Sequence, residues 1–193
     1  GPFAAAIIEE LAKQQFPLDG VLGLSDKKAG RGQKNLELPI KSAVDKTKYP
    51  FVEFSSQEEF TYILETTKPD IIIVADFGWI ISEYDLQQVK KAFLNIHPSL
   101  LPKYRGPSPI QSAILNGDQS TGVTLMELDQ QMDHGPILAQ EFVDIAQDET
   151  SESLISKTAS IGAKLLINSL PKYLDGSLLP NDQDHKISTF CQI

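Results

Sequence analysis

Apolar residues follow two spacings along this chain, one typical of helices and one typical of strands. Apolar positions three or four apart, as at Ile7, Ile8 and Leu11, indicate amphipathic helices, and the unbroken run 71–75 indicates a strand. The polar, glycine-containing stretch 25–37 is expected to be a loop. The full pattern predicts helices over residues 3–15, 39–47, 55–66, 83–91, 109–115 and 151–173, and strands over 21–24, 51–54, 71–75, 92–96, 122–128 and 136–145.

The alternation of helices and strands predicts an α/β fold with an open, mostly parallel sheet and helices on both faces. The run 71–75 is apolar throughout, as in a strand covered on both sides. Domains of this kind usually begin with a strand, whereas this chain begins with a helix, so we expect the first strand to be missing. We expect residues 1–176 to form one domain and residues 177–193 to form a polar linker or tail.

Length and composition narrow the class of protein. The chain has 193 residues, 41% of them hydrophobic, which is enough for one full-sized core but not for two ordinary domains. No stretch approaches the roughly 18 apolar residues of a membrane span, and no charged-then-apolar leader opens the sequence. The single cysteine, Cys191, excludes a disulfide within the chain. Together these features predict a soluble cytoplasmic protein.

Charge is distributed unevenly. The net charge of −9 disfavours a general nucleic-acid binder, because phosphate contacts need a basic surface. Residues 1–50, however, hold 8 Lys and Arg against 6 Asp and Glu, whereas residues 51–193 hold 9 against 20. A polyanionic partner is therefore expected to touch the first quarter of the chain. Charge alone is equally compatible with two ordinary solvated surfaces.

The densest cluster of reactive side chains covers residues 95–106, where a predicted strand runs into a proline-rich loop. Sites in open parallel sheets form at the carboxyl ends of strands. Asn95 and His97 are two residues apart, so both side chains leave the same face of an extended strand. An amide donor beside an imidazole suits stabilisation of a developing oxyanion together with proton transfer. Taken alone, a histidine at a strand end is more often a structural residue.

A second cluster lies in the glycine-ended loop 128–136, where Asp129 and Asp133 are four residues apart. This spacing by itself favours ordinary turn chemistry. The alternative is that one of the two carboxylates faces His97 and orients its ring.

Other chemistries are less consistent with the sequence. His97, His134, Asp129 and Asp133 do not have the spacing of a zinc site. Ser99 follows His97 closely but lacks the strand–turn–helix context of an activated serine. A dinucleotide site is disfavoured because no G-x-G-x-x-G follows a strand, although a missing first strand weakens that objection.

The two clusters resemble the formyltransferase family. The segment from His97 to Gly106 matches the family's H-x-S-x-L-P-x-x-x-G signature at every fixed position. Asn95 falls at the family's catalytic asparagine, and Asp133 falls at its catalytic aspartate. The similarity extends from Gly1 to about Tyr173.

This resemblance implies a Rossmann-like fold and 10-formyltetrahydrofolate as the formyl donor, with no metal. It implies that Asn95 and His97 stabilise the oxyanion formed when an amine attacks the formyl group, with Asp133 assisting. The resemblance implies that the pterin ring lies against the loop segments 75–80 and 129–133 and against the signature loop. The residues expected to contact the folate are Ala75, Phe77, Gly78, Ile80, Ser99, Leu101 and Asp129.

The acceptor is indicated by a basic loop. Residues 29–34 resemble the A-G-R-G-x-K loop of methionyl-tRNA formyltransferases, which implies that Arg31 and Lys34 contact initiator methionyl-tRNA. The C-terminal barrel domain usual in those enzymes is expected to be absent from this chain. Two alternatives stay open: an N-formyltransferase for nucleotide-linked amino sugars, and a folate-binding module without turnover.

Overall fold

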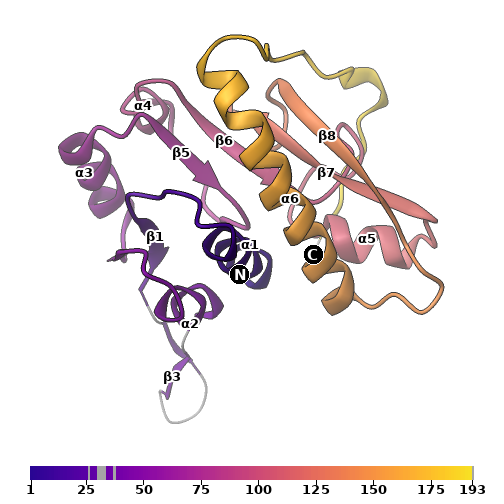
Figure 1. Ribbon diagram of the computed structural model, residues 1–193, viewed down its shortest axis with the longest axis horizontal. Coiled ribbons are helices and arrows are strands. Elements are labelled where there is room, and N and C mark those ends of the chain that lie inside the picture. Colours follow the sequence, from indigo (N-terminus) through magenta and orange to yellow (C-terminus); the bar gives the residue numbers. More distant parts are fainter. Residues whose placement is uncertain (26, 30–33, 37, 193) are drawn as a thin grey trace.

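The computed structural model describes residues 1–25, 27–29, 34–36 and 38–192 (Figure 1). The helices are α1 (Pro2–Lys13), α2 (Pro39–Asp45), α3 (Gln57–Thr67), α4 (Glu83–Leu86), α5 (Pro109–Leu115), α6 (Ser151–Leu174) and the 3-10 turn η1 (His185–Ile187). The strands are β1 (Val21–Leu24), β2 (Lys27–Ala29), β3 (Lys34–Leu36), β4 (Phe51–Phe54), β5 (Ile71–Val74), β6 (Ala92–His97), β7 (Ser120–Glu127) and β8 (Ile137–Asp144).

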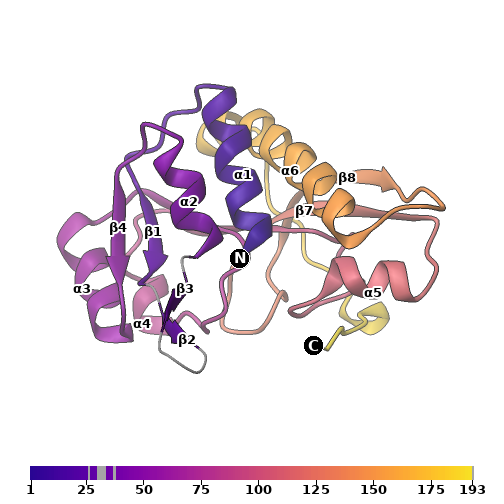
Figure 2. The same cartoon turned by 90° about the horizontal axis from the view of Figure 1, so that it is seen from below.

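The strands form a parallel pair, a hairpin and a four-stranded sheet. β1 pairs with β4 in parallel, and the four-stranded sheet has the order β5-β6-β7-β8. In that sheet β5 and β6 are parallel, whereas β7 and β8 run antiparallel to their neighbours. Figure 2 shows α1, α2 and α6 on one side of the strands and α4 and α5 on the other. The predicted α/β fold with helices on both faces is confirmed, with an antiparallel half added by β7 and β8.

Strand β6 separates the main core from the functional face. Leu94 and Ile96 are fully buried in the main core, which also contains apolar residues of α1 and α6. Phe93 points the other way, into a second core with residues of α3 and β4. Because side chains alternate along a strand, Asn95 and His97 leave β6 on the same side as Phe93. The packing of β6 therefore decides which way the candidate site faces.

Helix α6 approaches β6 closely. A Cβ added at Gly162 would lie 2.7 Å from Cγ2 of Ile96, which is closer than side chains tolerate. Helix α6 runs along α1 on this face (Figure 1). This close contact holds β6 in place on the face opposite Asn95 and His97.

Two expected elements differ from the structure. The predicted loop 25–37 contains an antiparallel hairpin of β2 and β3, whose three-residue strands are too short and polar to give a period-two apolar pattern. The predicted helix 83–91 ends at Leu86. The rest of the predicted segment is not helical. The backbone N–H groups of Lys90 and Lys91 donate to the carbonyls of Pro69 and Asp70 at 3.0 and 2.9 Å, and not to carbonyls within a helix.

Strand β5 is confirmed, and apolar clusters cover both of its faces: Ile71 and Ile73 pack against the main core, and Ile72 and Val74 pack against the second core. Each of its four residues is only half-buried. Among the described strands only β6 pairs with β5, which therefore lies at the edge of its sheet. An apolar run therefore marked the strand correctly but not its place in the sheet.

Among the described residues, no helix has both the length and the apolar character needed to cross a membrane.

A buried carboxylate holds the loop 77–82 against α3. The Asp85 side chain is fully buried and accepts hydrogen bonds from Gln57, Thr61 and Ser82, each at 2.6 Å. Ser82 in turn caps α4 by accepting from the backbone N–H of Asp85. Three neutral donors thus satisfy one buried anion, as a buried charge requires.

We predict that Asp85→Ala lowers the free energy of unfolding by about 2–4 kcal/mol, because three donors lose a buried charged acceptor. Urea unfolding followed by circular dichroism measures this change. The exposed Asp148→Ala is the matched control and is expected to stay within about 0.5 kcal/mol of the unsubstituted chain. Equal stability of the two variants would contradict the role given to Asp85.

Candidate active site

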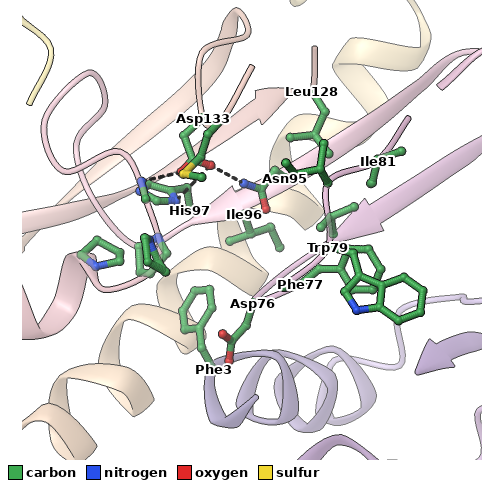
Figure 3. Close-up of a pocket in the computed structure, with 18 of the residues that line it drawn as sticks. Phe3, Asp76, Phe77, Trp79, Ile81, Asn95, Ile96, His97, Leu128 and Asp133 are labelled. Carbon is green, nitrogen blue, oxygen red and sulfur yellow. Dashed lines mark hydrogen bonds and ion pairs between the residues drawn. The ribbon is translucent and has the colours of Figure 1, made fainter. Parts of the chain in front are cut away.

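Three polar side chains meet at the carboxyl end of β6. Asn95 and His97 are 8% and 5% exposed, and the Asp133 side chain is 12% exposed. Nδ2 of Asn95 donates to Oδ1 of Asp133 at 3.3 Å, and Nδ1 of His97 lies 3.5 Å from the same oxygen. Figure 3 shows the three side chains side by side at one end of the cavity. The structure thus brings together the three residues that the sequence singled out, although 36 positions separate His97 from Asp133.

Asp133 reaches this position through an unusual turn. Its φ of 48° lies in the left-handed region that L-residues rarely adopt. A Cβ at Gly135 would lie 2.1 Å from the carbonyl oxygen of Glu127, so the turn needs glycine there. The second carboxylate oxygen, Oδ2, accepts from the backbone N–H of Gly106 at 2.7 Å. The carboxylate therefore joins β6, the signature loop and its own turn.

The hydrogen bonds of His97 assign its two nitrogens different roles. Nε2 lies 2.9 Å from the carbonyl oxygen of Tyr104. A carbonyl can only accept, so Nε2 carries a proton and donates it. Nδ1, which faces Asp133, is then the nitrogen free to gain or lose a proton. The Tyr104 carbonyl thereby fixes both the tautomer and the orientation of the ring.

The signature residues Ser99 and Leu101 hold the loop and do not line the cavity. Ser99 is fully buried, and its Oγ donates to the carbonyl of Lys103 at 2.6 Å. Leu101 is 3% exposed, and its N–H donates to Oγ1 of Thr124 at 3.1 Å. The peptide bond between Leu101 and Pro102 is cis. Neither residue lines the cavity, and direct folate contacts from Ser99 and Leu101 stay a prediction.

The three polar residues line a cavity of about 410 Å³, a volume in the range of small-molecule sites. Apolar residues form its opposite end: Phe77, Trp79, Ile81 and Leu128, all belonging to the second core (Figure 3). Of the expected folate contacts, Phe77, Gly78, Ile80 and Asp129 line this cavity. Ala75 packs against the main core instead.

The cavity also offers backbone hydrogen-bonding groups. Within the described part of the chain, the N–H and C=O groups of residues 77–80 make no hydrogen bond to another protein group. A flat heterocycle with polar edges can use such groups while its faces contact Phe77 and Trp79. Polar backbone beside aromatic walls suits a flat heterocyclic ligand.

Sequence reasoning missed two supporting residues. Arg105 is 3% exposed and Gln183 is 5% exposed, and their side chains hydrogen-bond at 2.6 Å. Burial lowers the pKa of the Arg105 guanidinium, and the charges of Asp133 and Asp129 partly offset this. No local pattern could have revealed the pair, because Gln183 lies in a polar segment far from the signature loop. In the sequence, Arg105 stands out only because it lies within the signature loop.

The expected tRNA contacts are only partly described. Arg31 lies outside the described residues, and Lys34 begins β3. In the described part of the chain, no group of three or more His, Cys, Asp and Glu side chains could hold a metal ion. The thiol of Cys191 is buried and forms no disulfide bond.

Comparisons with known proteins identify the family of the chain. The formyl transferase family matches residues 1–170. The chain is 38% identical to methionyl-tRNA formyltransferase of Thermotoga maritima, over 97% of this chain and 61% of that protein. It is 39% identical to the enzyme of the same name from Roseiflexus sp. (strain RS-1), over 99% of this chain and 60% of that protein. The chain thus spans about three fifths of the length of these relatives.

Solved structures share the fold. Phosphoribosylglycinamide formyltransferase from Bacillus halodurans is 29% identical with a TM-score of 0.67, covering 91% of each chain. Glycinamide ribonucleotide transformylase 1 from Symbiobacterium toebii has a TM-score of 0.73 at 18% identity, covering 95% of this chain and 91% of that one, which shows likeness of fold alone. With its family match over most of its length and its relatives at almost 40% identity, this chain belongs to the formyl transferase family.

Proposed function

We propose that this chain transfers a formyl group from 10-formyltetrahydrofolate to the amino group of initiator methionyl-tRNA, in the cytoplasm. The observation that carries this proposal is the convergence of Asn95, His97 and Asp133 on one cavity, in a chain whose curated relatives are methionyl-tRNA formyltransferases. The aromatic wall and unpaired backbone groups of residues 77–80 support a pterin-containing donor.

The chemistry follows from the positions of the polar groups. The acceptor amine forms a bond to the formyl carbon, the bond from that carbon to the folate nitrogen breaks, and the formyl oxygen carries negative charge in between. Nδ2 of Asn95 has a second hydrogen that its bond to Asp133 does not use, and this hydrogen can be donated to the oxyanion. A donor of this kind contributes on the order of 3–4 kcal/mol to transition-state stabilisation.

Proton transfer is assigned to His97 and Asp133. The amine loses a proton as its bond to carbon forms, and the departing folate nitrogen gains one. Nδ1 of His97 is the free nitrogen of the ring and lies beside the carboxylate of Asp133. These two groups can hold the proton between the two events. No covalent intermediate on the protein is needed.

We predict that Asn95→Ala lowers kcat by about 10²–10³-fold, because one donor to the oxyanion is lost. We expect His97→Ala or Asp133→Asn to lower it by about 10²–10⁴-fold through loss of proton transfer. Single-turnover transfer from 10-formyltetrahydrofolate to charged initiator tRNA measures these rates. The exposed variants Asn168→Ala and Asp148→Asn are matched controls. Near-native rates in any of the three site variants would refute the assignment.

We predict that Arg31→Ala raises KM for methionyl-tRNA and leaves KM for the folate donor unchanged, because the basic loop contacts the nucleic acid. Losing one phosphate contact lowers the slope of log affinity against log salt by about 0.7–1. The exposed Lys164→Ala on α6 is the control. An unchanged salt slope would remove Arg31 from the tRNA site. Transfer to a nucleotide-linked amino sugar in place of tRNA would identify the other acceptor class.

A further inference from the structure

The segment after α6 returns past β8 and the signature loop and is anchored at two places. Asn181 exchanges backbone hydrogen bonds with Ile137 of β8 at 2.7 and 2.8 Å. Further on, the carbonyl of Thr189 accepts from the N–H of Arg105 at 2.9 Å, and the N–H of Cys191 donates to the carbonyl of Arg105 at 2.8 Å. Figure 1 shows this segment in yellow, running from the end of α6 toward α5. Gln183 lies between the two anchors.

Every polar atom of the Gln183 side chain is used. Its Oε1 accepts from Nη2 and Nε of Arg105 at 2.6 and 3.2 Å. Its Nε2 donates to the carbonyls of Asp133 and Gly135 at 2.9 and 2.7 Å. The reverse orientation of the amide would place NH₂ against a guanidinium and oxygen against two carbonyls. The network therefore requires an amide at this position, with its oxygen toward Arg105.

Gln183 connects the same two segments that the Asp133 carboxylate connects. The carboxylate accepts from the N–H of Gly106, the residue next to Arg105. The Gln183 amide joins Arg105 to the backbone of Asp133 itself. The backbone of Asp133 has a positive φ, a conformation that persists only when its surroundings hold it. Two hydrogen bonds supply that restraint. The side chain of Asp133 accepts from Gly106, and its backbone carbonyl accepts from Gln183.

We infer that Gln183 is a positioning residue for Asp133, an inference that rests on the catalytic role proposed for Asn95, His97 and Asp133. Gln183 does not line the cavity, and it acts by holding the turn at residues 133–135 against the signature loop. With the turn released, Oδ1 of Asp133 loses its place beside Asn95 and His97. The segment after α6 is thereby part of the site's support.

The sharpest test is Gln183→Glu, which preserves size and the acceptor for Arg105. A carboxylate has no N–H to donate, so the two carbonyls at Asp133 and Gly135 face an anion. We expect kcat for formyl transfer to fall on the order of tenfold to a hundredfold, as when reacting groups are slightly misplaced. KM for the folate donor is expected to stay within about twofold, since Gln183 contacts neither Phe77 nor Trp79 at the apolar end of the cavity. Gln192→Glu, an exposed change of the same charge in the same segment, is the control.

A second readout does not depend on turnover. The Gly106 amide proton, bonded to Oδ2 of Asp133, reports the carboxylate's position in ¹H–¹⁵N spectra. We expect Gln183→Glu to shift this resonance and to speed its hydrogen exchange by about tenfold or more, while Gln192→Glu leaves both unchanged. A folded Gln183→Glu protein with an unmoved Gly106 resonance overturns the inference, whatever its rate. If this variant does not fold, the isosteric Gln183→Met is judged by the same two criteria.

The two proposals fail in different ways. Absence of transfer by the unsubstituted chain counts against the proposed function, while the Gly106 resonance still decides the role of Gln183. Normal transfer by the unsubstituted chain and equal kcat in Gln183→Glu refute the positioning role and leave the proposed function standing.

Discussion

The site depends on the contacts of the Asp133 carboxylate with β6 and the signature loop. One oxygen lies beside Asn95 and His97 on β6, and the other accepts from the backbone of Gly106 in the signature loop. Residues 95–106 and the turn at Asp133 are well separated in the sequence, and the carboxylate joins them. A largely buried anion needs such donors, because unpaired burial of a charge is costly. The same contacts that satisfy the charge also place Asp133 beside Asn95 and His97.

The rest of the fold makes that junction possible. Strand β6 buries Leu94 and Ile96 on one side, which directs Asn95 and His97 to the other. The Tyr104 carbonyl orients the His97 ring, and the network around Gln183 holds the turn that carries Asp133. The cavity therefore has a polar end built on a rigid strand and an apolar end built from the second core. That asymmetry suits a reaction in which charge develops on one atom of a largely flat, apolar-faced donor.

Membership of the formyl transferase family and the site geometry rest on different observations. The family match covers residues 1–170 and depends on sequence, whereas the contacts of Asp133 are properties of the structure. The curated relatives are longer, and this chain spans about three fifths of their length.

The sequence by itself determined the α/β class, most elements of the sheet and the trio of Asn95, His97 and Asp133. Local apolar spacing encodes helices and strands, and the family signature is a local string. Only the tertiary structure decided that β5 is an edge strand, that Ser99 and Leu101 support the loop from within, and that Gln183 is buried against Asp133. Burial and pairing depend on which distant segments meet, and a polar residue in a polar tail carries no local sign of its partner.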